Sequence, residues 1–594
     1  MSSISVSGKN WKYKNFNQEE INYLKDNYFL DEITSKLLSI RKIKRDEITN
    51  FLNPSIKNFL PNPEVLIDMK KTTQRIMKSI EKNEKIGIFG DYDVDGASSA
   101  ALLGNYFHKL NLSYETYIPN RIKEGYGPSK ESFENLIKKG VKIILTVDCG
   151  SMSYDAIQFA KSKKIDVIVL DHHQTEINLP DAFSIINPNR FDDKSNLNYL
   201  CAAGVTFIFL VSLNKELRSK NWFQNKNLNE PNLLEFLDLV SLATVCDVVP
   251  LVGLNRALVS QGLKVLGTKK NLGLKTLIDI CKIENNPNIY HLGYVIGPRI
   301  NAGGRVGKSY HGVNLLLKSD PKEVFQIASE LDQFNSERKL LEEKVYKNIL
   351  VEADKLKNDS VIVVSGTNWH EGVIGIVASR IKDKFNKPVI IISIENNTGK
   401  ASARSIVGFD IGSVIISGVQ QGLLIKGGGH KMAGGFSIKL ENIEKFREFT
   451  IRKFSKINEN TNERKSLLLD SVITSSAINL DFYQKIYLLA PFGSGNPEPK
   501  FAIENLKVVN SKIISEKHIK SILIDKAGLS INTIAFNSVD KEIAAYLLKK
   551  NNKLFNIAGK LSLNEWRGKS NVEFIIDDIS VNKNVKNMVP SSIG

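Results

Sequence analysis

This sequence contains few cysteines, and it has neither a long apolar run nor an apolar leader. Each of these features excludes a class of protein. The spacing of the cysteines, with no C-x-x-C pair, argues against a disulfide framework and a zinc knuckle and fits a reducing compartment. There are only four of them: Cys149, Cys201, Cys246 and Cys281. No stretch approaches the roughly 18 apolar residues of a membrane span. Residues 1–25 are polar and lack the apolar core of a signal peptide, so we expect a cytoplasmic protein without a membrane partner.

Negative charge is under-represented. The chain has 81 Lys and Arg against 64 Asp and Glu, which gives a formal charge of +17. An excess of this size favours a polyanionic partner such as nucleic acid. Lysine is abundant throughout, often beside Asn and Ile, so a general compositional bias explains the charge equally well. Charge alone therefore does not decide the partner.

At 594 residues the chain is too long for one hydrophobic core, and we expect several domains. The pattern predicts a helical N-terminal segment, an α/β domain with a parallel sheet, a long connecting helix, a smaller α/β domain, a β-barrel of the OB-fold type and a loose tail. Their predicted bounds are residues 1–64, 65–318, 319–356, 357–460, 465–582 and 583–594.

Strands alternate with helices in the first α/β domain. Residues 86–89, 141–147 and 165–170 are short, apolar and rich in β-branched side chains, which is typical of parallel strands buried on both faces. The second α/β domain is predicted from strands at 361–364, 388–393 and 400–406. For the barrel, five strand-like runs surround a helix expected over 541–549. We detect no internal repeat.

Acidic and histidine residues follow each of the three strands of the first domain. In a parallel sheet the ligand crevice lies beyond the carboxyl ends of the strands, so these side chains should gather at one edge. Carboxylates that close repel one another unless a cation neutralises them. The residues in question are Asp91, Asp93, Asp95, Asp148, Asp171, His172 and His173, and Asp247 is a further acid within an apolar stretch.

Oxygen ligands with one or two histidines select Mn²⁺ or Mg²⁺, and two such ions suit phosphodiester hydrolysis. The Asp-x-Asp-x-Asp string predicts convergence, because extended residues two apart project to the same side. Other interpretations stay open at this point. The string suits a solvated acidic turn, Asp148 suits a helix N-cap that reaches the amides near Ser151, and Asp247 suits a carboxylate bonded to backbone amides. An EF-hand is disfavoured by the strand-then-helix flanks.

Together, residues 91–96, 148–150 and 171–173 and Asp247 resemble the four motifs of the DHH phosphoesterase superfamily. Residues 427–436 resemble the signature of its associated second domain. The string Gly-Pro-Arg-Ile-Asn-Ala-Gly-Gly-Arg at 297–305 is similar to that of the single-strand-specific exonucleases within the superfamily. The resemblance implies a 5′→3′ exonuclease that degrades single-stranded DNA with Mn²⁺ or Mg²⁺, with two ions expected, in repair and recombination.

The resemblance also implies roles for individual residues. The implied metal ligands are Asp93, Asp95, Asp148, His172 and Asp247. Asp91, His173 and His430 are implied in catalysis, through support of the ligands or contact with phosphate. The implied DNA contacts are Arg121, Arg299, Asn301, Arg305, Ser402, Arg404, Gly428 and Gly429. On the barrel, Trp566, Arg567 and Lys569 are candidates for a stacking, basic surface, although Trp566 fits a barrel core equally well.

Two alternatives of other classes were weighed. A DHH phosphodiesterase of short oligonucleotides or small nucleotides typically lacks the 297–305 string and the barrel, both of which this sequence has. An inactive replication scaffold with the same fold would have lost ligands, and every expected ligand is present. We also expect a monomer, and at the family level a single-stranded-DNA-binding protein and recombination helicases as partners.

Overall fold

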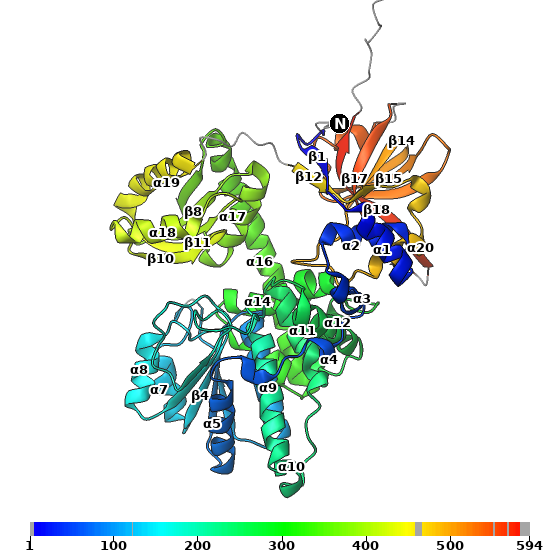
Figure 1. Ribbon diagram of the computed structural model, residues 1–594. Coiled ribbons are helices and arrows are strands. Elements are labelled where there is room, and N and C mark those ends of the chain that lie inside the picture. The colour runs from blue at the N-terminus through cyan, green and yellow to red at the C-terminus, as the bar shows by residue number, and fades with distance from the viewer. Residues whose placement is uncertain (1–4, 122, 458–465, 550–552, 567–568, 582–594) are drawn as a thin grey trace, which may run out of the picture. The chain divides into compact units, whose positions relative to one another are not determined.

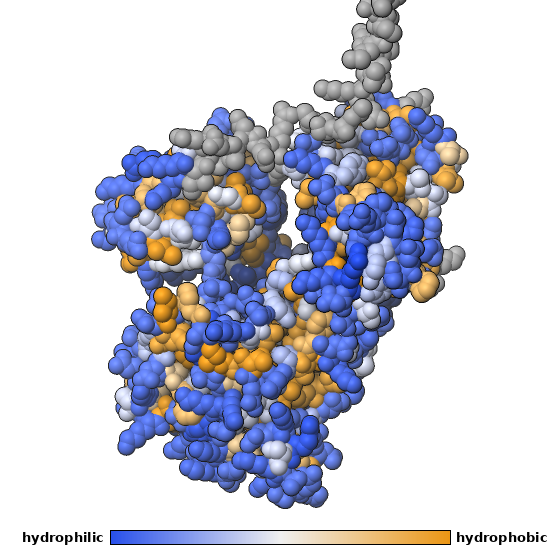
Figure 2. All heavy atoms as spheres, viewed as in Figure 1, coloured by the Kyte–Doolittle hydropathy of each residue, from blue (hydrophilic) through white to orange (hydrophobic). Residues whose placement is uncertain are grey.

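The computed structural model describes residues 5–121, 123–457, 466–549, 553–566 and 569–581 (Figure 1). The chain forms two compact units. The larger falls within residues 61–249 and 258–461, and the smaller within residues 1–60, 250–257 and 462–594. Polar side chains cover much of the visible surface in Figure 2, while the apolar residues form separate buried cores. Among the described residues, no helix is long and apolar enough to cross a membrane.

The larger unit begins with the predicted α/β domain. Its five strands are all parallel, in the order β3-β2-β4-β5-β6. They are β2 (Ile86–Gly90), β3 (Tyr114–Tyr117), β4 (Ile143–Val147), β5 (Asp166–Leu170) and β6 (Ser184–Ile186). Every residue of β2 and β4 is buried, as their apolar sequences predict. The helices of this domain are α5 (Met69–Glu81), α6 (Val94–Lys109), α7 (Lys130–Lys138), α8 (Tyr154–Ser162) and α9 (Ala202–Ser219).

A helical half follows this sheet and ends in the long connector. Its elements are α11 (Leu237–Cys246), α12 (Gly253–Gly267), α13 (Leu272–Ile280), the π-helix η4 (His291–Ile296), α14 (Gly297–Arg305), α15 (Tyr310–Leu317) and α16 (Pro321–Lys355). Asp320 caps α16 by accepting from the amide of Glu323 at 2.9 Å. The predicted helix over residues 321–356 is therefore present, with Val345, Ile349 and Ala353 buried along one side.

The smaller α/β domain has the strand order β10-β11-β9-β8-β7. Its strands are β7 (Ile362–Thr367), β8 (Val389–Glu395), β9 (Thr398–Arg404), β10 (Lys426–His430) and β11 (Ala433–Lys439), and its helices include α17 (Glu371–Phe385), α18 (Ile411–Gln420) and α19 (Ile443–Ile457). The glycine-rich string forms the hairpin β10–β11. Glycine is required where this hairpin meets α18, because a Cβ on Gly434 would lie 2.4 Å from the Ile415 side chain.

The smaller unit contains the closed five-stranded barrel that the sequence predicts. Its strands are β14 (Phe501–Ile514), β15 (His518–Ile524), β16 (Ser530–Ala535), β17 (Phe555–Trp566) and β18 (Lys569–Ser580), and pairing of β14 with β17 closes it. The helix expected over residues 541–549 is much shorter, α21 (Ala544–Leu547).

The N-terminal segment is predicted to be helical, but it also contains a strand. It opens with β1 (Asn10–Tyr13), which pairs in parallel with β12 (Ser466–Leu469). The Trp11 indole donates to the Asp578 carboxylate of the barrel at 3.0 Å, and both residues are buried. A pairing across more than 450 residues cannot be seen in local sequence, which is why the strand was missed.

Arg256 connects three separate stretches of sequence within the smaller unit. Its guanidinium is buried and donates to the carbonyls of Phe51 and of residues 489–491, at 2.7–3.2 Å. Burial lowers its pKa to about 10. Because its partners are carbonyls, the Arg256 side chain satisfies backbone groups that would otherwise need a hydrogen bond from water.

Candidate metal centre and phosphate pocket

Strand register places three aspartates at one edge of the parallel sheet. Gly90 of β2 is level with Val147 of β4, which is level with Leu170 of β5. The next residue along each strand is an aspartate, and the Asp148 amide still donates to the Leu170 carbonyl at 3.1 Å. Asp91, Asp148 and Asp171 therefore share one level, and all three are buried.

The other two acids of the first string reach the same place by a different route from the one predicted. Asp93 is the N-cap of α6, and its carboxylate accepts from the amides of Asp95 and Gly96 at 2.9 and 3.1 Å. Asp95 lies in the first turn. The string is thus a strand end followed by a capped helix, not a run of extended residues. Gly96 lets the first turn of α6 pack closely against the backbone of Asp91, because a Cβ on Gly96 would lie 2.5 Å from the Asp91 carbonyl oxygen.

The His172 ring lies among three carboxylates. Its Nε2 is 3.3 Å from Asp148, 3.6 Å from Asp247 and 3.7 Å from Asp95. Three overlapping groups of possible ligands result, in each of which the donor atoms lie within 4.8 Å of one another. The groups are Asp91, Asp93 and Asp148; Asp95, His172 and Asp247; and Asp148, His172 and His173.

The electrostatics of this cluster favour a bound cation. Burial, reinforced by repulsion from Asp95 and Asp93, raises the pKa of Asp148 far above its usual range and that of Asp247 to about 8. Burial and repulsion from Asp93 likewise raise the pKa of Asp91 well above its usual range. Moreover, Nε2 of His172 and Oδ1 of Asp91 are buried without a hydrogen-bond partner among the described residues. Divalent ions supply both the missing positive charge and the missing partners, so these residues fit such ions.

The alternative interpretations of Asp148 and Asp247 do not hold. Among the described residues, no backbone amide donates to either carboxylate, whereas the amide of Ser151 bonds to Asp171 at 3.1 Å. Asp148 also has a left-handed backbone, φ 61°, which is uncommon outside glycine and asparagine and is typical of functional sites. Asp95 does accept two amides, those of Ala202 and Ala203 at the start of α9, and so holds that helix as well as facing His172.

Asp171 orients His173 and belongs to none of these ligand groups. It accepts from Nδ1 of His173 at 2.8 Å and from the amides of both histidines. Burial disfavours the charged forms of Asp171 and His173. The hydrogen bond between their side chains outweighs burial, so the pKa of Asp171 lies well below its usual range and the pKa of His173 is raised to about 9. The Asp171 carboxylate thus favours the imidazolium form of His173, whose side chain is 36% exposed beside the metal centre.

Three further residues support the site and were missed in the sequence. The Tyr126 hydroxyl donates to the carbonyl oxygen of Asp148 at 3.1 Å and lies 3.3 Å from Nδ1 of His173. Asn187 and Asn189 donate to the carbonyls of His173 and His172 respectively. The only signal for the asparagines is their position in Asn-Pro-Asn directly after β6, which is also typical of an ordinary turn.

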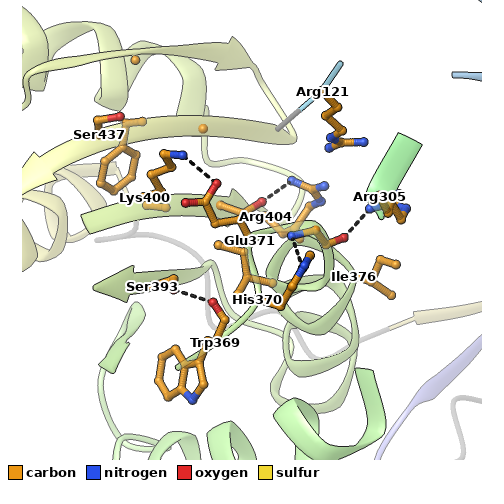
Figure 3. Close-up of a pocket in the computed structure, with 18 of the residues that line it drawn as sticks. Arg121, Arg305, Trp369, His370, Glu371, Ile376, Ser393, Lys400, Arg404 and Ser437 are labelled. Atoms are coloured by element: carbon orange, nitrogen blue, oxygen red, sulfur yellow. Dashed lines mark hydrogen bonds and ion pairs between the residues drawn. The ribbon is translucent and has the colours of Figure 1, made fainter. Parts of the chain in front are cut away.

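A cavity of about 1190 Å³ lies beside this centre within the larger unit (Figure 3). Arg121, Tyr126 and Arg305 line it from the first domain. The second domain contributes the start of α17 together with Ser402 and Arg404 of β9. Because Tyr126 both lines the cavity and contacts Asp148 and His173, the cavity and the metal centre are continuous.

Three arginines line the cavity, and none of them forms an ion pair with a carboxylate of the described residues. Arg404 donates to the Ser402 hydroxyl and to the Ala403 carbonyl, and Arg305 donates to the Gly372 carbonyl (Figure 3). Burial lowers the pKa of both, and for Arg305, reduced to about 10, the neighbouring Arg121 and Arg404 add to this. In Figure 3 the nearby Glu371 pairs instead with Lys400, at 2.8 Å. Clustered guanidinium groups at a helix N-terminus suit a phosphate.

The remaining predicted DNA contacts lie elsewhere. Arg299 is held by Asp332 at 2.8 Å and by the Val295 carbonyl, so its guanidinium is already engaged. Gly428, Gly429 and His430 form the exposed strand β10, and with Asn301 they are not among the cavity-lining residues. On the barrel, Arg567 and the side chains of Trp566 and Lys569 lie outside the described part of the structure.

Three family models match the chain. They are the DHH family N-terminal domain over residues 85–244, the DHHA1 domain over 358–456 and the RecJ OB domain over 469–578. Single-stranded-DNA-specific exonuclease RecJ of Salmonella typhimurium is 34% identical over 89% of this chain and 92% of its own length. RecJ of Bacillus subtilis is 30% identical over 97% of this chain and 72% of its own. The crystal structure of RecJ from Thermus thermophilus in complex with Mn²⁺ has a TM-score of 0.80 at 25% identity, over 98% of this chain and 80% of the other.

Asn in place of Asp148 should have opposite effects with and without metal. Removing one buried charge relieves repulsion, so Asp148→Asn is expected to raise the melting temperature of the metal-free protein. The same change should weaken Mn²⁺ binding by about 100-fold or more, since a ligand is lost. Calorimetric titration and thermal unfolding with and without Mn²⁺ measure both effects.

Asp155→Asn, an exposed change on α8 of the same domain, is the matched control and should alter neither quantity. Undiminished stabilisation of Asp148→Asn by Mn²⁺ would contradict the ligand assignment.

Proposed function

The chain belongs to the RecJ family of single-stranded-DNA-specific exonucleases, and from this premise we propose that it hydrolyses single-stranded DNA from the 5′ end, in repair and recombination. One observation supports this above the rest. A buried carboxylate–histidine centre adjoins an arginine-lined cavity, with Tyr126 lining the cavity and bonded to the centre. A strand with its 5′-phosphate in the cavity would present a nearby phosphodiester to the centre.

The metal centre is proposed to hold two Mn²⁺ or Mg²⁺ ions. Asp93, Asp148 and Asp91 would hold one, and Asp95, His172 and Asp247 the other. By resemblance Asp91 supports the ligands or contacts phosphate, but its unpartnered oxygen favours direct ligation. When bound, such ions activate a water molecule and stabilise the leaving oxygen. RecJ structures in complex with Mn²⁺ and with Mg²⁺ from Thermus thermophilus support this choice of metal.

The chain's own side chains position the phosphate. His173, cationic and held by Asp171, is proposed to donate to a non-bridging oxygen of the scissile phosphate, where negative charge develops. Tyr126 fixes the orientation of His173. His430 is also assigned near the scissile phosphate by resemblance. It lies at the exposed end of β10, so this role depends on the strand crossing that edge.

The cavity is proposed to bind the terminal 5′-phosphate through Arg121, Ser402 and Arg404, with Arg305 behind them. Arg299 is better assigned a structural role, because its Nε donates to Asp332 and its Nη1 to the Val295 carbonyl. Asn301, Gly428 and Gly429 keep the role of contacts along the strand on resemblance alone. A single-stranded-DNA-binding protein and recombination helicases as partners, a monomeric state and a cytoplasmic location likewise rest on the resemblance.

Substrate length separates this function from that of a small-nucleotide phosphodiesterase. With Mn²⁺, the protein should degrade 5′-labelled single-stranded DNA in preference to blunt duplex and to dinucleotides. Release of labelled mononucleotide over time is the measurement. A preference for dinucleotides would overturn the exonuclease assignment, and no hydrolysis of any of the three would favour the inactive scaffold.

Loss of Arg404 should remove the preference for a phosphorylated end. A charge-assisted hydrogen bond contributes about 1.5–3 kcal/mol, so Arg404→Gln is expected to lower kcat/KM about 10–100-fold on a 5′-phosphate strand. A 5′-hydroxyl strand should be affected far less. Arg452→Gln on α19 of the same domain is exposed and serves as the control. If both strands lost activity equally, Arg404 would not bind the terminal phosphate.

A further inference from the structure

The cavity in the larger unit is larger than a terminal phosphate needs. Its volume is about 1190 Å³, as large as sites that hold whole small molecules. In Figure 3, Arg121 and Arg305 lie on one side of Arg404, and these three arginines are the groups proposed to surround the terminal phosphate. Lys400 and Ser437 lie on the other side of Arg404. This far part of the cavity, which we call the recess, has no role in the proposed function.

Strand register sets four polar side chains side by side along the floor of the recess. They are Ser393 of β8, Lys400 of β9, Ser437 of β11 and Lys426 of β10, and we call them the lysine row. All four line the cavity, as Ser402 and Arg404 do, so they face the same side of the sheet. Along β9 the lysine row lies before Ser402, and Arg404 lies after it. The row is therefore beyond the proposed phosphate site.

Glycines keep the floor open between that site and the lysine row. Ser402 is level with Gly435, and Gly435 is level with Gly428. A Cβ on Gly428 would meet no atom within 4 Å, and a Cβ on Gly435 would meet only the Ala401 carbonyl oxygen, at 3.4 Å. The two positions between Ser402 and the strand of Lys426 therefore carry no side chain. A linear anion bound at Ser402 has room to extend toward Lys426.

The positive charge of the cavity exceeds what a terminal monophosphate balances. Five Lys and Arg residues line it, against two carboxylates, Glu371 and Glu395. A phosphate monoester carries about −1.5 to −2 charge at pH 7. Lys426 is exposed and forms no ion pair among the described residues. Lys400 pairs with Glu371 at 2.8 Å, but both side chains are more than a third exposed, and exposed pairs are weak. The lysine row thus has charge available for further phosphate groups.

We propose that the lysine row binds the second and third phosphates of a single strand that ends in a 5′-triphosphate. This rests on the proposed function and adds a class of strand end to it. The phosphate on the sugar would take the site of the terminal monophosphate, and the other two would extend over Gly435 toward Lys426. A chain of phosphates is the favoured occupant because the recess continues the phosphate site and offers lysine and serine donors in one line.

The first cut on such an end would release a different product. A cavity that binds a 5′-phosphate can act repeatedly only if each shortened strand keeps one, so the P–O3′ bond is the bond that breaks. The water oxygen stays on the phosphate of the shortened strand, and O3′ takes up a proton and leaves with the released nucleotide. From a triphosphate end the first product is thus a deoxynucleoside triphosphate, and every later product is a monophosphate.

Three ends on one sequence test the proposal. Single-stranded oligothymidylate with a 5′-hydroxyl, a 5′-monophosphate or a 5′-triphosphate is incubated with the protein and Mn²⁺, and the products are separated by anion-exchange chromatography. The wild type should cut the triphosphate strand at least as well as the monophosphate strand and release thymidine triphosphate first. Activity no higher than on the hydroxyl strand, or release of pyrophosphate ahead of thymidine monophosphate, would overturn the proposal.

Lys426 is the residue to change, because no carboxylate loses its partner when it is replaced. Lys426→Gln removes one charge-assisted hydrogen bond and should lower kcat/KM on the triphosphate strand about 10-fold, with far less effect on the monophosphate strand. Lys426→Arg keeps the charge and should behave as wild type. Lys445→Gln, an exposed change on α19 of the same domain, is the control. An equal loss on both strands would show that the lysine row is not a separate site.

Binding without metal separates the recess from the proposed function. In EDTA, where no cleavage occurs, the triphosphate strand should bind the wild type more tightly than the monophosphate strand, and Lys426→Gln should remove the difference. A wild type that shows this difference but cleaves no strand with Mn²⁺ would keep the lysine row and refute the proposed function. If inorganic triphosphate binds while the triphosphate strand gains nothing over the monophosphate strand, the recess takes free polyphosphate and the proposal is wrong.

Discussion

Mutual repulsion among buried carboxylates is the constraint on which the site depends. The ends of β2, β4 and β5 lie level, so the acids that follow them cannot separate without breaking the strand register. The protein offsets part of this cost locally. Asp93 accepts the amides of α6, Asp95 those of α9, and Asp171 the His173 ring. Within the described structure, Asp148 and Asp247 accept no backbone amide and one carboxylate oxygen of Asp91 has no hydrogen-bond partner, and a divalent ion fits that shortfall.

The two domains contribute different parts of the cavity. In the proposed function, a metal centre of this kind acts on phosphoesters in general, whereas Arg404 of β9, together with Arg121 and Arg305 of the first domain, selects a molecule with a terminal phosphate. Tyr126 connects the two, because one hydroxyl contacts the Asp148 backbone and His173 while the ring lines the cavity. In the proposed function, this shared side chain keeps the end of a DNA strand close to the bond that is cut.

Much of the architecture could be predicted because it is local. Alternation of apolar strands with helices predicted the parallel sheet, the 35-residue helix α16 followed from one uninterrupted pattern, and five strand-like runs indicated the barrel. The misses were of a different kind. Strand β1 pairs with residues more than 450 positions away, and the helix expected over 541–549 shrank to Ala544–Leu547. Tertiary packing overrides weak local preference in such segments.

For the candidate site, the sequence by itself determined which acids and histidines follow the strands, and therefore that they meet at one edge. Only the tertiary structure decided which role each of these residues has. Asp95 holds α9, Asp171 orients His173, and Arg299 is engaged by Asp332. In the described part of the chain, Arg121, Arg305 and Arg404 form no ion pair with a carboxylate. The physical reason is that a residue type fixes what a side chain can bind, whereas its partner depends on which distant backbone folds against it.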